Sequence, residues 1–271
     1  MRTICFLSDF GLGDDFVGLC KGVISRVAPG AGVIDLSHDV PGFGIEAGAE
    51  ILEHATGYMP EDAVYLAVVD PGVGTERRGL ALETVRGTFL VGPDNGLLVP
   101  AAEAMGGVAD AVSLTNPEYQ VLPVSNTFHG RDVFAPAAAH LAAGRELVEL
   151  GGRVDPTSLV RVELPGAERV DGYISATILG IDRYGNARLS AHQDEAGFGF
   201  GTILEIQAGE GTMTVCYSET FGSSKAGDLI VVPDSHRRLS LCVNRGNASR
   251  ALSLKVGERV LLKQLHPGET G

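Results

Sequence analysis

The apolar pattern of this chain changes once, and that change limits the folds open to it. Up to about residue 155, short runs rich in Val, Ile and Leu at residues 3–7, 32–36 and 63–69 predict strands buried on both faces. Between them, residues 15–27 and 45–56 carry apolar side chains at helical spacing. The alternation of strand and helix predicts right-handed crossovers and a mostly parallel sheet.

The helical segments carry apolar stripes that are expected to face the core. In the first, the stripe consists of Phe16, Leu19, Cys20, Val23 and Val27. In the second, it consists of Ile45, Ala49, Leu52 and Ala55. A later helix is expected over residues 133–143, ending before Gly144.

After the Leu164-Pro165-Gly166 break, the apolar runs become short and closely spaced. Strands separated by Gly, Asp and Asn turns are predicted at residues 173–181, 202–206, 212–217, 228–232, 239–243 and 259–263. This spacing favours a small antiparallel barrel or sandwich. We therefore expect an α/β domain over residues 1–160 and an all-β domain over residues 168–271.

Charge and composition exclude several classes of function. The 271 residues include 21 Lys and Arg against 34 Asp and Glu, a net charge of −13, which disfavours nucleic acid and anionic membranes as partners. The longest apolar run, residues 63–69, is too short to span a membrane, and no signal-peptide core follows Met1. The four cysteines form no Cys-x-x-Cys pair, so buried thiols and a cytoplasmic location are predicted.

Three polar clusters stand where a parallel sheet would hold a ligand, beyond the carboxyl ends of its strands. They are residues 8–15, 70–78 and 127–132. The Gly11-x-Gly13 pair, with Asp35 as a ribose acid, allows a dinucleotide-binding interpretation. Asp14 and Asp15 oppose it, because carboxylates repel a pyrophosphate at a helix start. Helix capping is the structural alternative for one of these two acids.

The other two clusters contain ambiguous side chains. Arg78 is expected to be a solvated charge, and the Asp70 loop could serve turn geometry alone. His129 has Thr127, Arg131 and Asp132 beside it as candidate hydrogen-bonding partners, and histidine handles protons near neutral pH.

Two hydrolase mechanisms are alternative uses of such residues. A metal cage could use Asp9, Asp14, Asp70, His129 and Asp132, although no short ligand spacing supports it. A Ser–His–Asp hydrolase is disfavoured, because no Gly-x-Ser-x-Gly elbow occurs.

Together, the motifs resemble those of the S-adenosylmethionine hydroxide adenosyltransferases, relatives of fluorinase and chlorinase, over nearly the whole chain. The matching blocks are residues 6–11 (FLSDFG), 68–75 (VVDPGVGT), 93–98 (PDNGLL), 127–132 (TFHGRD), 181–186 (IDRYGN) and 244–248 (NRGNA).

The resemblance implies a Rossmann-like N-terminal domain, a C-terminal β-barrel and a homotrimer with sites at subunit interfaces. It also implies that S-adenosylmethionine and water give adenosine and L-methionine, with no cofactor and no metal. The catalytic set of the family matches Asp70, Arg77 and His129. A sulfonium leaves readily, so the task is to deliver water in line to C5′ of the ribose. Asp70 and His129 could each accept its proton, and Arg77 could hold the carboxylate.

The resemblance also assigns substrate contacts. Asp9 is expected to bind the ribose hydroxyls, while Phe43 and Phe128 line the sulfonium and ribose region. The methionine amino and carboxylate groups are assigned to Asp14, Asp182, Asn244 and Arg245. The adenine contacts are assigned to Tyr184, Asn186, Phe221 and the backbone of Ala248.

Differences from the halide-using relatives disfavour halogenation. Those relatives carry Tyr at the positions of Asp70 and His129, and fluorinases carry Ser at Gly130. Fluorinases also carry Trp at Phe43 and Ser at Phe16, and these two departures bear on the methionine end of the site. The alternatives that stay open are a halogenase of the same fold, a metal-dependent hydrolase, and a non-catalytic protein that binds S-adenosylmethionine or adenosine.

Overall fold

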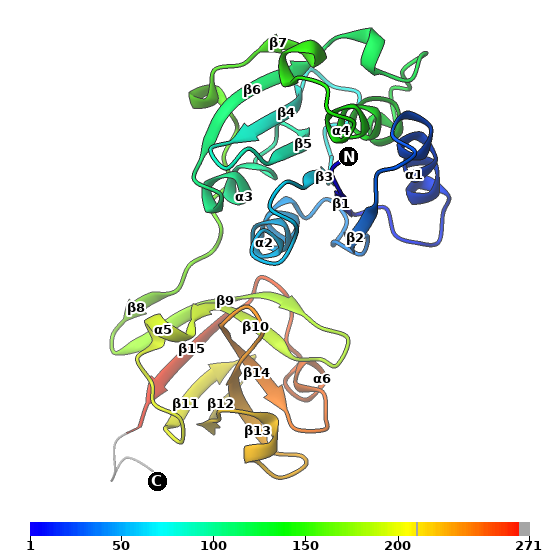
Figure 1. Ribbon diagram of the computed structural model, residues 1–271. Helices are drawn as coiled ribbons and strands as arrows, with labels where there is room; N and C mark the ends of the chain where they lie inside the picture. The colour runs from blue at the N-terminus through cyan, green and yellow to red at the C-terminus, as the bar shows by residue number, and fades with distance from the viewer. Residues whose placement is uncertain (210, 266–271) are drawn as a thin grey trace. The chain divides into compact units, whose positions relative to one another are not determined.

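The computed structural model describes residues 1–209 and 211–265 and forms two compact units, Met1–Leu164 and Pro165–Gly271. Figure 1 traces both units, and each is described by itself. The first is an α/β unit and the second an all-β unit, which confirms the predicted fold class.

The first unit is built on a seven-stranded sheet with the order β2-β1-β3-β5-β4-β6-β7. The β2-β1-β3-β5 half is parallel, and β4, β6 and β7 extend it with antiparallel pairings. The strands are β1 (Ile4–Ser8), β2 (Val33–Ser37), β3 (Val64–Val68), β4 (Gly79–Thr84), β5 (Phe89–Pro93), β6 (Val108–Leu114) and β7 (Gly151–Arg153). The helices are α1 (Phe16–Val27), α2 (Ile45–Ala55), α3 (Val99–Ala104) and α4 (Ala135–Ala142).

Helices cover both faces of this sheet, which makes a three-layer, Rossmann-like unit (Figure 1). Ile4 and Phe6 of β1 pack in one core with α1 and α4, whereas Cys5 and Leu7 pack in the other with α2 and α3. Alternate strand residues point to opposite faces, so a strand that is apolar throughout serves both cores. The carboxyl ends of β1 and β3 are parallel neighbours, with Ser8 paired to Val68.

Two predictions about burial in this unit are wrong in part. Strand β2 lies at the edge of the sheet, so Ile34 is 39% exposed and the strand is not buried on both faces. Helix α1 is turned so that Val17, Cys20, Val23 and Ile24 are buried, while Phe16 and Leu19 of the expected stripe are exposed. In α2, by contrast, Ala49, Leu52 and Ala55 are buried as predicted.

Several elements of this unit have no counterpart in the sequence predictions. They are strands β4, β5, β6 and β7 and helix α3. The helix expected over residues 133–143 is preceded by a π-helical segment, Gly130–Phe134, and α4 itself covers Ala135–Ala142. Short 3-10 turns also occur in the chain, at Pro117–Tyr119, Leu147–Leu150, Pro156–Ser158 and Phe221–Ser223.

The second unit is a closed barrel, which decides between the predicted barrel and sandwich. Its strands follow the order β10-β14-β13-β12-β11-β15-β9, and β9 pairs again with β10 to close the ring. Strand β8 adds to β9 outside the ring, and β12 runs parallel to β13, so the barrel is not antiparallel throughout. The elements are β8 (Glu168–Val170), β9 (Tyr173–Ile181), β10 (Ala187–His192), α5 (Gln193–Ala196), β11 (Ile203–Ala208), β12 (Gly211–Tyr217), β13 (Leu229–Pro233), β14 (Arg238–Val243), α6 (Ala248–Leu252) and β15 (Arg259–Gln264).

Candidate active site

Three side chains from distant parts of the first unit meet beyond the carboxyl end of β3. Asp70 follows this strand, Arg77 precedes β4, and His129 stands just before the π-helical segment. Arg77 Nε donates to Asp70 Oδ1 over 2.8 Å, and Arg77 Nη2 donates to Asp70 Oδ2. Arg77 Nη2 also lies 2.9 Å from His129 Nδ1. The structure thus brings together all three residues expected to be catalytic.

The contact with Arg77 determines which ring nitrogen of His129 carries the proton. A guanidinium has only donors, so Nδ1 must be the acceptor and the ring proton of neutral His129 must be on Nε2. Burial, followed by the Arg77 cation, lowers the pKa of His129 below its ordinary value. His129 is therefore neutral at physiological pH, with Nε2–H able to act as a donor.

Backbone geometry holds the loops that carry these side chains. Asn95 donates its amide to the carbonyl oxygen of Val69 over 2.8 Å, which fixes the chain one residue before Asp70. Gly74 has a φ of +77°, and a Cβ there would lie 2.3 Å from the carbonyl oxygen of Asn126. Only glycine permits this approach, which brings the loop before His129 against the Asp70 loop.

Aromatic rings form an apolar wall beside the polar cluster. Phe128, next to His129 in the chain, packs edge-on against Phe10 and Phe16 at centroid distances of 5.8 and 5.0 Å. The guanidinium of Arg131 lies over Phe128 at 5.1 Å. The aromatic group lies near the end of β1, because Phe10 is two residues beyond that strand, and Phe16 is its exposed member.

The other predicted residues of this unit lie in two loops, one between β1 and α1 and one before α2. Asp9 follows β1, and its Oδ2 accepts the backbone N–H of Phe43 over 3.0 Å. Phe43 has a φ of +64° and is 73% exposed. Asp14 is exposed, and Asp15 occupies the N-cap position of α1, where its backbone carbonyl accepts from Leu19.

The remaining predicted residues lie on three loops of the barrel unit. Asp182 accepts from the backbone N–H groups of Tyr184 and Asn186, at 2.8 and 2.9 Å, and from the Asn186 amide. Asn244 donates to the carbonyl oxygens of Phe221 and Ser224, both at 2.9 Å.

The loops carrying Asp182 and Ala248 are joined by a backbone bond from Ser249 N–H to Gly185 O. Ala248 opens α6, and Arg245 stands before it with a φ of +56°. Tyr184 and Phe221 are 67% and 43% exposed, so their rings offer accessible faces.

Two expectations about polar partners are wrong. Arg78 is not a solvated charge: its Nε donates to Asp94 Oδ2 over 2.7 Å, and Nη2 donates to the carbonyl oxygen of Ser158. The hydrogen-bonding partner of His129 is Arg77 and not one of the predicted neighbours. Asp132 is fully buried and pairs with Arg131. The sequence neighbours of His129 shape its loop, since Asp132 also accepts from the Ser125 N–H.

The metal cage considered as an alternative has no counterpart in the described part of the chain. Within residues 1–209 and 211–265, no group of three or more His, Cys, Asp or Glu side chains is placed to hold a metal ion. Two of the hypothesised cage residues are engaged by cations instead, Asp70 by Arg77 and Asp132 by Arg131.

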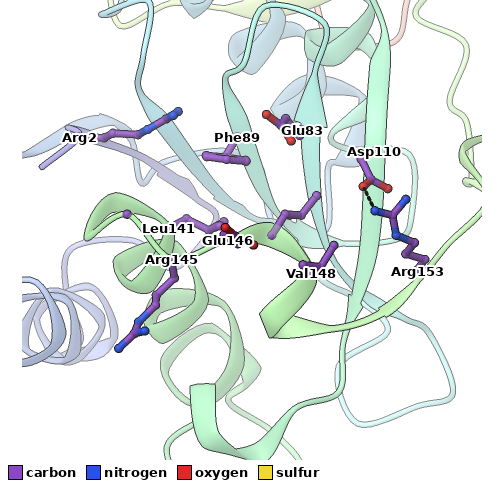
Figure 2. Close-up of a pocket in the computed structure, with 11 residues that line it drawn as sticks. Arg2, Glu83, Phe89, Asp110, Leu141, Arg145, Glu146, Val148 and Arg153 are labelled. Carbon is purple, nitrogen blue, oxygen red and sulfur yellow. Dashed lines mark ion pairs between the residues drawn. The ribbon is translucent and has the colours of Figure 1, made fainter.

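A separate cavity of about 430 Å³ lies at the other end of the sheet (Figure 2). Its lining includes Glu83, Phe89 and the ion pair between Arg153 and Asp110, whose charged atoms are 3.2 Å apart. Phe89 pairs with Val64 at the start of β3, so this cavity is remote from Asp70 at the end of that strand. It contains none of the predicted site residues.

Residues whose supporting contacts the sequence does not predict include Asn95 and Asp94, which hold the Asp70 and Arg78 loops. The PDNGLL motif contains both, but nothing in its local pattern names their partners. His38 is a further case, because its contact with Ser8 depends on the pairing of β1 with β2.

Comparison with known proteins agrees with this architecture. Models of the S-adenosylmethionine hydroxide adenosyltransferase N-terminal and C-terminal domains match residues 4–151 and 176–261. The chain belongs to this family. An (R)-S-adenosyl-L-methionine hydrolase of Salinispora tropica is 43% identical over 261 residues, covering 95% of this chain and 96% of the relative.

Two further proteins extend the comparison. A Thermus thermophilus protein of the same name is 41% identical over 269 residues, covering 97% of this chain and all of the relative. The crystal structure of an uncharacterized conserved protein from Thermotoga maritima superposes with a TM-score of 0.89 at 34% identity, covering 96% of this chain and 99% of that one. Among the helices of the described residues, none is both long and apolar enough to cross a membrane.

Proposed function

We propose that this protein hydrolyses S-adenosyl-L-methionine to adenosine and L-methionine. The observation that carries the proposal is the position of Arg77, which binds Asp70 and His129 at the same time. The names of its relatives specify the (R) form of the sulfonium, and we propose the same substrate form here.

The reaction is an in-line displacement at C5′ of the ribose. A new bond forms between the water oxygen and C5′, and the bond between C5′ and sulfur breaks with its electron pair remaining on sulfur. Methionine leaves as a neutral thioether, so the leaving group needs no acid. The remaining demand is to orient one water and to accept one proton, which is a positioning and proton-transfer task.

The hydrogen bonds favour Asp70 as the proton acceptor. His129 Nδ1 is occupied by the Arg77 donor, and its lowered pKa opposes protonation. Oδ1 of Asp70 accepts from Arg77 Nε alone and retains a lone pair for the proton, whereas Oδ2 accepts from both Nε and Nη2. His129 Nε2–H would then donate to the attacking water and hold it in line with C5′.

Substrate recognition is assigned by the resemblance, with chemistry that suits a cation. Asp9 is the proposed acceptor for the ribose hydroxyls, and Asp14 is a proposed contact of the methionine amino group. In the barrel unit, the proposed contacts are Asp182, Tyr184, Asn186, Phe221, Asn244, Arg245 and Ala248. The exposed rings of Tyr184 and Phe221 support stacking on adenine. No cofactor enters this scheme.

We further propose a homotrimer in which each site lies at a subunit interface. Two features support it: the assigned residues are divided between the two units, and apolar side chains are exposed near the end of β1. Leu12, Phe16 and Leu19 are 70%, 41% and 40% exposed, and such surfaces commonly serve as contacts with another chain. A cytoplasmic location is proposed because all four cysteines are free thiols.

Incubation with S-adenosyl-L-methionine in heavy-oxygen water tests the proposed reaction. We expect adenosine labelled at its 5′ oxygen together with unlabelled L-methionine, detected by chromatography with mass spectrometry, and a preference for the (R) sulfonium. Activity that EDTA abolishes would favour a metal-dependent hydrolase instead. Tight binding without turnover would favour a non-catalytic binding protein.

A further inference from the structure

Ser8, His38 and Asp35 form a series of polar contacts beneath the Asp9 loop. Ser8 Oγ and His38 Nδ1 are 2.7 Å apart, and His38 Nε2 lies 3.2 Å from Asp35 Oδ1. The other oxygen of Asp35 accepts from Lys21 Nζ over 2.6 Å. The arrangement has the residue types of a hydrolase triad, which the sequence motifs give no reason to expect.

Burial excludes Ser8 as a nucleophile. Ser8 is 0% exposed, and the side chain of His38 is 2% exposed. Phe6 also packs edge-on against the imidazole at 4.7 Å. A substrate carbon cannot reach the hydroxyl, so the series must act on its neighbours in the chain.

The direction of the hydrogen bond between Ser8 and His38 follows from the groups around it. The Phe10 N–H donates to one lone pair of Ser8 Oγ over 3.4 Å, and the Asp35 carboxylate beside His38 Nε2 favours a ring proton there, so Nδ1 accepts the Ser8 hydroxyl hydrogen. The ring proton of neutral His38 is then on Nε2, beside the Asp35 carboxylate. The second contact is a polar one, in which Nε2 lies 3.2 Å from Asp35 Oδ1 without the alignment of a hydrogen bond. The series therefore runs from the partly exposed Lys21 inward to the last residue of β1.

Asp9 lies between two anchors that both come from His38. On one side, the imidazole holds Ser8, and on the other, the His38 carbonyl oxygen accepts the Gly11 N–H over 2.7 Å. The Asp9 carboxylate is held in turn by the Phe43 N–H. The backbone of Ser8 is paired with Val68, so losing the imidazole contact would free only the Ser8 side chain, and with it the Phe10 N–H contact that closes the turn around Asp9.

We propose that His38 and Ser8 are positioning residues that set the Asp9 carboxylate for the ribose hydroxyls. The proposal rests on the proposed function for the identity of the ligand. A hydrogen bond to a charged group is worth enough free energy that misplacing Asp9 is expected to cost about tenfold in affinity for a hydroxylated ribose.

Two substitutions of His38 separate its contacts. His38→Asn keeps an acceptor near the position of Nδ1 and so retains the Ser8 contact. His38→Gln places its amide near the position of Nε2 and so retains the Asp35 contact alone. The affinities of adenosine and 2′,3′-dideoxyadenosine are measured by calorimetry on the full-length protein, together with the melting temperature of each variant.

We expect the wild type to prefer adenosine, and His38→Gln to lose about tenfold of that preference while its affinity for the dideoxy compound is unchanged. His38→Asn should keep the preference, and Ser8→Ala should lose it; Ser8→Ala decides the matter if His38→Gln does not fold. A Ser8→Ala variant that keeps the full preference, or variants that weaken both ligands equally, would overturn the proposal. A wild type without the preference also overturns it, whereas preference without turnover overturns only the proposed hydrolysis.

Discussion

Arg77 donates to Asp70 and to His129 from one guanidinium, and its Nη2 lies 2.9 Å from His129 Nδ1. Asp70 and Arg77 are largely buried, with side chains 6% and 11% exposed, so solvent does little to weaken the pair. The planar fork makes both contacts at once, and a single ammonium on a flexible stem cannot reproduce that geometry.

Arg77→Lys should therefore behave as a severe substitution although it keeps the charge. We expect the turnover number to fall by about 10²-fold, the scale of losing proper proton handling. The affinity for 5′-deoxyadenosine should change little, because this compound lacks the 5′ oxygen that Asp70 and His129 contact in the proposed reaction. Steady-state kinetics and calorimetry measure the two quantities, and near-normal turnover in Arg77→Lys would contradict the bridging role.

Asp70→Asn and His129→Ala test the two partners of Arg77 separately. Each should lower turnover by about 10²-fold or more, because one removes the proton acceptor and the other removes the donor that orients water. The amide oxygen introduced by Asp70→Asn can still accept a hydrogen bond from Arg77, so substrate binding should be retained. Single-turnover kinetics at saturating substrate isolate the chemical step, and full activity of Asp70→Asn would exclude Asp70 as the base.

The contacts of Arg77 also show how much of the site can be predicted from the sequence. The motifs name Asp70, Arg77 and His129 through the family resemblance, but no spacing rule connects residues 77 and 129. Periodicity reports which positions of an element are apolar, not which of them another element covers. The same limit explains the exposed Ile34 of β2 and the exposed Phe16 of α1.

Contacts between loops are the least predictable features. The sequence predicts that Arg78 is a solvated charge, yet Asp94 and Ser158 bind it. They can do so because the segment around the 3-10 turn at Pro156–Ser158 returns to the sheet. The antiparallel strands β4 and β6 escape prediction because they lack the long apolar runs of β1 and β3. The barrel, in contrast, can be anticipated from turn spacing, since short strands at regular intervals have few other solutions.

The pH dependence of activity should follow His129. Burial and the Arg77 cation lower its pKa below the ordinary value of 6.5, so the unfolded chain binds this proton more readily than the folded one. The stabilising contribution of neutral His129 is therefore complete above pH 6.5 and lost as the pH falls through the lowered folded-state pKa. Turnover should fall over the same acidic window, because a proton on Nδ1 would face the Arg77 donor.

Titration of the imidazole signals by nuclear magnetic resonance, beside a pH profile of the turnover number, tests this assignment. Burial also lowers the pKa of His140, which contributes to stability with the same sign. His140→Asn should therefore remove part of the acid-dependent loss of stability and leave the acidic limb of turnover in place. An acidic limb that disappears in His140→Asn would reassign it away from His129.

The proposed trimer makes a prediction about α1. Light scattering should give a mass of three 28.3 kDa chains. Leu19→Glu, which places a charge on an exposed apolar position of α1, should dissociate the assembly and abolish turnover. Val85→Glu is the matched control, since Val85 is 66% exposed just beyond the end of β4, and it should leave the mass unchanged. A monomer with full activity would refute the trimer.

The choice of nucleophile separates this chain from halide-using relatives. Asp70 places a carboxylate beside the proposed attacking atom, and a carboxylate repels chloride while accepting a hydrogen bond from water. At about 4 Å and an effective dielectric near 20, the carboxylate alone repels chloride by at most roughly 4 kcal/mol, and the Arg77 cation bound to Asp70 offsets part of this repulsion. Water should win although it is the poorer nucleophile, since it is neutral and can be oriented. We expect adenosine as the product even in concentrated chloride, with the 5′ oxygen drawn from labelled water. Chromatography that shows 5′-chloroadenosine as the main product would reverse the assignment and favour a halogenase.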